Sequence, residues 1–169
     1  MIYTCTLETP LGVMRAAADE RAGPAICGLW FLGQKYFPVE AGTWTESPNL
    51  PVFGVMRNWL GDYFAGKGPG EAPRLAPAGS PFRQAVWKLL REIPYGKTTS
   101  YGALAGRLGA GGKVPAFQAV GGAVGHNPIS IIIPCHRVLG AGGGLTGYAG
   151  GLDRKQALLE LEAGAQTTL

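Results

Sequence analysis

Residues 66–80, GKGPGEAPRLAPAGS, decide how this chain is organised. They are dense in glycine, proline and alanine, and they show neither the helical period nor the alternation of a strand. We therefore expect an amino-terminal domain over residues 1–72, a linker over 73–80 and a carboxy-terminal domain over 81–169. A chain of 169 residues with 46% hydrophobic content is long enough to bury a core.

Before that stretch, the amino-terminal third has the pattern of a small antiparallel sheet. Three β-rich apolar runs span residues 2–7, 13–18 and 25–31, and residues 9–12, TPLG, mark a turn between the first two. From residue 51 to 64, a proline is followed by apolar residues at intervals of three and four, which predicts a helix. We expect this helix to cover the sheet.

After that stretch, the pattern changes to helices. Residues 81–93 keep helical spacing behind Ser80, a suitable N-cap. Residues 100–108 and 115–123 predict two more helices across a glycine-rich turn, which is the form of a helix-turn-helix. The exposed face of such a unit is a candidate for entering a DNA groove. An ordinary helical hairpin in a core has the same spacing and is the commoner structure.

The candidate nucleophile follows an isoleucine-rich run, Ile129–Ile133, which ends at Pro134. Cys135 comes next, so a thiol lies at the edge of a buried segment. A free cysteine has a pKa of about 8.5 and needs a base or a cation nearby to act as a nucleophile. His136 is available as that base. The alternative is a structural cysteine beside a surface histidine, which is the more common role of an isolated Cys-His pair.

A carboxylate strengthens the catalytic interpretation. In the helix expected after Gly151, Glu162 falls on the same side as Leu152, Leu158 and Leu159. Glu160 lies about 200° around the helix from Glu162 and is expected in solvent. A buried carboxylate needs a partner, and His136 is a candidate, because the pair would fix the ring's tautomer and stabilise its cation.

Composition narrows the class of protein. Three cysteines are an odd number in a chain of this length, which favours reduced thiols over a disulfide framework. The net charge of +4 suits a polyanionic partner, although the sequence has no Lys/Arg run. We find no basic region followed by an apolar run at the start and no stretch of membrane-spanning length, so we expect a cytoplasmic protein without a membrane partner.

Taken together, these residues resemble the O6-alkylguanine-DNA alkyltransferases, also called methylated-DNA–protein-cysteine methyltransferases. The resemblance runs from Pro81 to Gly164 and is looser in the amino-terminal third. It is carried by residues 133–138, IPCHRV, by Asn127-Pro128 before them and by residues 147–151, GYAGG, after them. It implies an α+β fold, with a small ribonuclease-H-like α/β domain and a helical domain. The helical domain would hold a winged-helix-like helix-turn-helix that enters the minor groove of double-stranded DNA.

The same resemblance implies roles for single residues. Cys135 is similar to the alkyl acceptor, His136 to the base that acts on it through water, and Glu162 to the carboxylate behind that histidine. Asn127 is similar to the asparagine that braces the active-site turn, and Tyr101 to the tyrosine that contacts the flipped guanine and supplies a proton. The implied contacts to the base are Val138, Tyr148 and Ala149. The candidate contacts to DNA on the second helix of the helix-turn-helix are Phe117, Gln118, Ala119 and Gly121, of which the small residues would let the helix approach another surface closely.

The activity implied is direct reversal of DNA damage without a cofactor. The alkylated guanine leaves the duplex, and its O6-alkyl group passes to Cys135; O4-alkylthymine is a second candidate substrate. The thioether that forms offers no carbonyl to water, so the protein is consumed after one transfer. We expect a monomer, because no long apolar stripe remains once the two cores are assigned.

Two features depart from the family pattern: the residue at position 118 and the missing histidines of a zinc site. Gln118 stands where most members have an arginine that fills the gap left by the flipped base, so charge and a planar donor fork are missing. Phe117 beside it is either an apolar wedge in the base stack or a core residue. Cys5 and Cys27 resemble half of a zinc site found in some relatives, but the matching histidines are absent, so we expect no metal and a core role for both.

Three other functions share parts of this pattern. An alkyltransferase-like lesion marker would flip the base without transfer, but such relatives lack the cysteine. A helix-turn-helix transcription factor would need a regulatory domain, and none is visible in 169 residues. A cysteine hydrolase would turn over through an acyl-enzyme, so ester cleavage beyond one equivalent would distinguish it.

Overall fold

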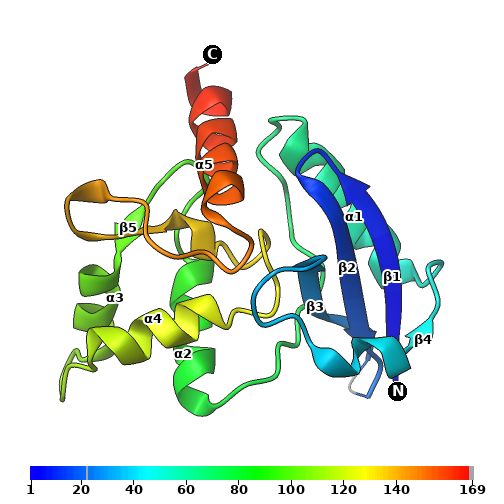
Figure 1. Ribbon diagram of the computed structural model, residues 1–169, viewed down its shortest axis with the longest axis horizontal. Helices are drawn as coiled ribbons and strands as arrows, with labels where there is room; N and C mark the ends of the chain where they lie inside the picture. Colours follow the sequence, from blue (N-terminus) through cyan, green and yellow to red (C-terminus); the bar gives the residue numbers. More distant parts are fainter. Residues whose placement is uncertain (22, 168–169) are drawn as a thin grey trace.

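A four-stranded sheet forms the amino-terminal half of the computed structural model, which describes residues 1–21 and 23–167 (Figure 1). Strands β1 (Ile2–Thr9), β2 (Gly12–Asp19) and β3 (Ala25–Phe31) pair in antiparallel order, so the predicted meander is confirmed. Strand β4 (Thr45–Glu46) adds to β1 in parallel and follows the 3-10 helix η1 (Val39–Thr43). Two residues are too few to carry a sequence pattern, and β4 was not expected.

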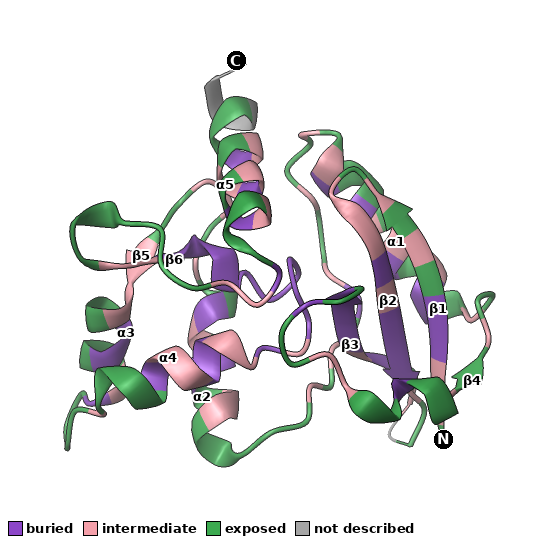
Figure 2. Cartoon of the chain, viewed as in Figure 1, coloured by how far each residue is buried: buried purple, intermediate pink, exposed green. Residues whose placement is uncertain are grey.

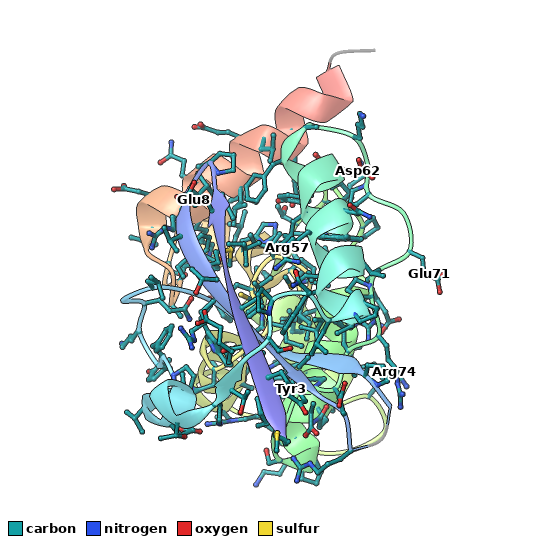
Figure 3. All side chains as sticks on the ribbon, turned by 90° about the vertical axis from the view of Figure 1, so that its right-hand side faces the viewer. Tyr3, Glu8, Arg57, Asp62, Glu71 and Arg74 are labelled. Atoms are coloured by element: carbon teal, nitrogen blue, oxygen red, sulfur yellow. The ribbon has the colours of Figure 1, made fainter. Side chains whose placement is uncertain are left out.

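Helix α1 (Pro51–Phe64) covers the sheet as predicted, because its apolar stripe needs a partner surface. The buried side chains of this stripe are Val52, Phe53, Met56, Leu60 and Tyr63. Figure 3 shows α1 beside the strands, with the labelled side chains of Glu71 and Arg74 directed outward from the segment that follows. On the sheet, Cys5 is fully buried, whereas Cys27 is only half-buried, so the core role expected for Cys27 is wrong.

Two distant segments add to the outer edge of β3. Ile26 donates its N–H to the carbonyl of Arg74 and accepts from the N–H of Ala76, both at 2.8 Å. Residues 73–80, expected as a linker, are therefore hydrogen-bonded to the sheet around Leu75. Farther along β3, the Leu29 N–H donates to the Pro128 carbonyl at 2.8 Å. The segment that leads to Cys135 is thereby attached to the sheet of the other half.

The helical half contains α2 (Pro81–Arg91), α3 (Tyr101–Leu108), α4 (Phe117–Gly125) and α5 (Leu152–Thr167). The predicted caps are confirmed: the Ser80 hydroxyl accepts from the Arg83 N–H, and the Ser100 hydroxyl accepts from the Ala103 N–H. Helix α4 begins at Phe117 and not at residue 115, because Ala116 has extended backbone angles, φ −66° and ψ 146°.

Between α4 and α5 the chain first runs through the interior and then forms an exposed loop over residues 141–147 (Figure 2). It forms the 3-10 helix η2 (Cys135–Arg137), strand β6 (Val138–Leu139), which pairs in parallel with β5 (Thr99–Ser100), and the 3-10 helix η3 (Ala141–Gly143). Every residue from 129 to 138 is buried. Within the described residues, no helix has the length and apolar character needed to cross a membrane.

Candidate active site

Asn127 fixes the turn that presents the cysteine. Its side-chain amide donates to the Ile133 carbonyl at 2.7 Å, and its side-chain oxygen accepts from the Ile129 N–H at 2.9 Å. Between those two bonds, Ile131 has φ 71°, a left-handed conformation that an isoleucine adopts only under constraint from its surroundings. Asn127 therefore closes a strained turn, and η2 starts with Cys135 directly after it.

Glu162 lies behind this turn and is 1% exposed. It accepts from the Tyr63 hydroxyl at 2.6 Å and from the Gly96 N–H at 3.0 Å. It also pairs with His136 Nε2 at 2.5 Å and with Arg137 Nε at 2.8 Å. Burial alone would raise the pKa of this carboxyl, but the bonds from His136 and Arg137 outweigh it and lower the pKa to about 2. Glu162 is therefore ionised, and its predicted contact with His136 is present.

His136 is fully buried and neutral. Burial lowers the pKa of its imidazole, and the hydrogen bond to Glu162 only partly opposes that effect. Because Glu162 is an ionised acceptor, the neutral ring carries its proton on Nε2 and donates it to the carboxylate. In the described part of the chain, Nδ1 has no hydrogen-bond partner. A lone pair is thus available there to accept a proton.

Cys135 lines a pocket of about 420 Å³ and is 7% exposed. Burial raises the pKa of its thiol, while a hydrogen bond with Asn127 and the charge of Lys155 oppose the rise. The resting group is therefore a protonated thiol, and a base has to remove its proton before the sulfur can attack. The other site residues expected from the sequence that line this pocket are Tyr101, Gly121, Tyr148 and Ala149.

Lys155 holds the pocket loop in place, and the sequence analysis missed it. Its ammonium group donates to the carbonyls of Val138 at 2.7 Å, Thr146 at 2.9 Å and Gly147 at 3.1 Å, and the side chain is fully buried. The helical spacing could have predicted its burial, because Lys155 is three residues before Leu158 and seven before Glu162 and therefore lies on the same helical face. Leu152, assigned to that face, is instead 47% exposed because it is the first residue of α5 and lies at the pocket wall.

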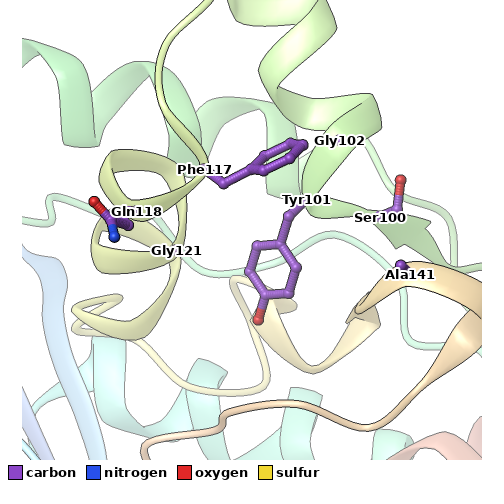
Figure 4. Close-up of a pocket in the computed structure, with 7 residues that line it drawn as sticks. All are labelled: Ser100, Tyr101, Gly102, Phe117, Gln118, Gly121 and Ala141. Atoms are coloured by element: carbon purple, nitrogen blue, oxygen red, sulfur yellow. The ribbon is translucent and has the colours of Figure 1, made fainter.

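A second pocket, of about 490 Å³, adjoins the first and shares Tyr101 and Gly121 with it. Figure 4 shows the rings of Tyr101 and Phe117 projecting into the space between α3, α4 and the segment at Ala141. Phe117 is 66% exposed, so the alternative of a core phenylalanine is wrong. Gln118 and Ala119 are also exposed on α4.

Three more residues at the site were given no role from the sequence, although Arg137 lies inside the quoted motif IPCHRV. Arg137 binds Glu162 and the Ile93 carbonyl, and Lys35 and Tyr36 reach the cysteine pocket from the amino-terminal half. Among the described residues, no three His, Cys, Asp or Glu side chains group closely enough to hold a metal ion.

Comparison with known proteins gives one consistent result. Residues 81–164 match the family model described as 6-O-methylguanine DNA methyltransferase, DNA binding domain. The methylated-DNA–protein-cysteine methyltransferase of Mycolicibacterium paratuberculosis is 47% identical over 162 residues, covering 96% of this chain and 93% of the relative. The protein of that name from Methanosarcina acetivorans is 42% identical over 165 residues, covering 95% of this chain and 98% of the relative.

Solved structures agree with the sequence relatives. The crystal structure of Mycobacterium tuberculosis O6-methylguanine methyltransferase has a TM-score of 0.84 and 44% identity, covering 98% of this chain and 94% of that chain. Mycobacterium tuberculosis OGT in complex with DNA has a TM-score of 0.84 and 42% identity, covering 96% of this chain and 94% of that chain. The similarity therefore includes both halves of the molecule.

Proposed function

Because this chain belongs to the family of methylated-DNA–protein-cysteine methyltransferases, we propose that it repairs DNA by moving an alkyl group from O6 of guanine onto its own Cys135. The observation that carries the assignment to Cys135 is its environment. The thiol lines a pocket, and a neutral His136 backed by an ionised Glu162 follows it in the chain. A nucleophile, a base and a group that orients the base are the parts that this chemistry needs.

The transfer proceeds in a defined order. His136 takes the thiol proton at Nδ1, directly or through a water, and Glu162 stabilises the imidazolium that results. The thiolate attacks the alkyl carbon, an S–C bond forms, and the C–O6 bond breaks with its electron pair remaining on guanine. Tyr101, in the pocket wall, donates a proton to the departing base. The imidazolium of His136 then returns the thiol proton to the tyrosinate through water, so the net proton moves from the thiol to guanine.

The product limits each molecule to one transfer. A thioether on Cys135 has no carbonyl for water to attack, in contrast to the thioester of a cysteine hydrolase. The same pocket is proposed to accept O4-alkylthymine, which also presents an alkyl group on an exocyclic oxygen. We infer that the protein acts as a monomer on double-stranded DNA that contains an alkylated base.

Access to Cys135 requires the base to leave the duplex, since the thiol is 7% exposed at the end of a pocket. The α3–α4 unit is proposed to enter the minor groove, with Ala119 and Gly121 allowing close approach. Phe117 is proposed to act as a wedge, because its exposed ring rests near Gly102 at the start of α3 and not in the core. Gln118 would then bond the orphaned base, while backbone groups of Val138 and Ala149 and the ring of Tyr148 contact the flipped one.

One experiment tests the proposal. The protein is mixed with a duplex that contains a single O6-methylguanine, its intact mass is measured, and the modified residue is mapped by peptide sequencing. We expect one methyl group per molecule on Cys135, with no further uptake in excess DNA. Cys135→Ser should take up none, and Cys27→Ser, which removes a half-buried thiol on β3, is the matched control.

Two outcomes would contradict the proposal. Tight binding to the lesion without methyl transfer would identify a lesion marker. Cleavage of an activated ester beyond one equivalent, lost in Cys135→Ser, would identify a hydrolase.

A further inference from the structure

A connection from the amino-terminal half reaches the cysteine pocket. Residues 32–37, here called the strap, follow β3 and cross toward the helical half. Lys35 and Tyr36 of the strap line the same pocket as Cys135. The N–H of Lys35 donates to the carbonyl of Ala149 at 3.0 Å, which attaches the strap to the pocket loop. The pocket is therefore closed by both halves of the chain.

The ring of Tyr36 is held in a fixed position against the end of α4. It stacks on the ring of His126, with 3.8 Å between the ring centroids and 24° between the ring planes. His126 is itself fixed, because its Nδ1 bonds the Gly122 carbonyl at 2.7 Å. Gly125, which precedes His126, also lies beside the Tyr36 ring: a Cβ added to it would be 3.9 Å from Tyr36 Cε2. The strap thus spans from the pocket loop to the end of α4.

The backbone of Tyr36 indicates that this position is constrained. Its φ is 63°, in the left-handed region that is unfavourable for a residue other than glycine. Such a conformation persists only where neighbouring contacts hold it. Gln34 supplies two of them: its side-chain oxygen accepts from the Phe31 N–H at 2.9 Å, and its amide donates to the Lys35 carbonyl at 3.2 Å.

We propose that Tyr36, stacked on His126, sets the upper size of the alkyl group that this pocket accepts. A flipped base has to bring its alkyl carbon to the sulfur of Cys135, which is reached through the pocket. The part of the pocket that the flipped base does not fill is the volume available to the alkyl group. Tyr36 is 50% exposed, so its ring forms an outer wall, and its removal opens that side of the pocket to solvent.

This inference rests on the proposed alkyl transfer, and the experiment separates the two. Single-turnover rates are measured by intact mass for two matched duplexes, one with O6-methylguanine and one with O6-benzylguanine. The readout is the ratio of the benzyl rate to the methyl rate. We expect Tyr36→Ala to raise this ratio on the order of tenfold, as for other changes in pocket size. Tyr36→Phe keeps the stacked ring and should keep the ratio.

A second variant changes the ratio in the opposite direction. Gly125→Ala adds a methyl group to the pocket wall beside Tyr36, at ordinary contact distance and without a positive φ, so it should lower the ratio. Val39→Ala, at a residue that is 96% exposed just beyond the strap, is the control and should leave both rates unchanged.

The outcomes are distinct. An unchanged ratio in Tyr36→Ala, with methyl transfer intact, overturns the inference and leaves the proposed function standing. An equal fall of both rates together with a lower melting temperature also overturns it, since the strap would then only support the fold. Absence of methyl transfer by the wild-type protein refutes the proposed function and this inference together.

Discussion

Replacement of Glu162 by glutamine removes the charge of this side chain and keeps its size, so it tests how much the charge contributes to stability. The carboxylate accepts hydrogen bonds from Tyr63, Gly96, His136 and Arg137. A glutamine of nearly the same size has a single acceptor oxygen and turns an NH2 group toward those donors. It also leaves the guanidinium of Arg137, which is 7% exposed, without a counter-charge. Loss of one partner of a buried pair costs about 3 to 5 kcal/mol, so we expect a loss of that size in the free energy of unfolding.

The pH dependence of stability gives a second value for what the Glu162 carboxylate contributes to the free energy of unfolding. The pKa of Glu162 falls from an ordinary 4.5 to about 2 in the folded protein, and at about 1.4 kcal/mol per unit this amounts to about 3 kcal/mol. A carboxyl group whose pKa is lower in the folded protein than in the unfolded protein stabilises the fold at pH values above its unfolded-state pKa. The stabilisation is lost as the pH falls from about 4.5 toward 2. Glu162→Gln should therefore show a flatter stability profile than the wild type in this range.

The assay is urea unfolding at pH 7 and at several lower pH values, followed by tryptophan fluorescence. Glu160→Gln is the matched control, because Glu160 is exposed on the same helix and accepts a hydrogen bond from the side chain of its exposed neighbour Gln156. The control should change the free energy of unfolding by no more than about 0.5 kcal/mol. A loss below about 1 kcal/mol in Glu162→Gln, or an acid profile as steep as that of the wild type, would refute the reasoning.

Three further predictions concern DNA contacts and the pocket loop. Gln118→Arg should tighten binding to a lesion duplex and steepen its salt dependence, because the added positive charge releases about one more counterion from the DNA. Fluorescence anisotropy at several salt concentrations measures the slope, and an unchanged slope would contradict the placement of Gln118 at the DNA. Phe117→Ala should slow transfer from duplex DNA about 5- to 150-fold, which corresponds to a stacking contribution of about 1 to 3 kcal/mol, while its reaction with free O6-benzylguanine stays constant. An equal slowing of both reactions would count against a wedge. Lys155→Met removes a nearby positive charge, so the pKa of the Cys135 thiol should rise, seen as an upward shift in the pH dependence of alkylation by iodoacetamide; an unchanged profile would show that the lysine only holds the loop.

Local patterns in the sequence predicted most of the elements and the candidate group of Cys135, His136 and Glu162. The meander, α1 and the serine caps follow from alternation, helical spacing and cap chemistry, which are properties of neighbouring residues. The contact between His136 and Glu162 followed from one helical face and from the need of a buried carboxylate for a partner. The attachment of Leu75 and Ile129 to β3 was out of reach, because each is an isolated bridge without a pattern of its own.

The strap was missed for a related physical reason. Residues 32–37 form turns between β3 and η1, and turn composition does not indicate what a loop contacts. Tyr36 reaches the pocket because Lys35 bonds Ala149 and because the Tyr36 ring meets His126, and these partners lie about a hundred residues along the chain. Contacts at that separation depend on how the two halves pack, and a single sequence does not record that packing.

The transfer that we propose would consume the protein, so an unreactive resting thiol would preserve it until it meets a lesion. Burial raises the pKa of the Cys135 thiol and lowers the pKa of the His136 imidazole, so at rest the proton stays on the sulfur. Oxidation of cysteine follows thiolate character and exposure, and both are low here. The Glu162 cluster therefore has a second effect beside orientation of the histidine. The Glu162 carboxylate bonds Nε2 of His136 and shares its charge with the Arg137 guanidinium, so it stabilises the imidazole ring once that ring is protonated.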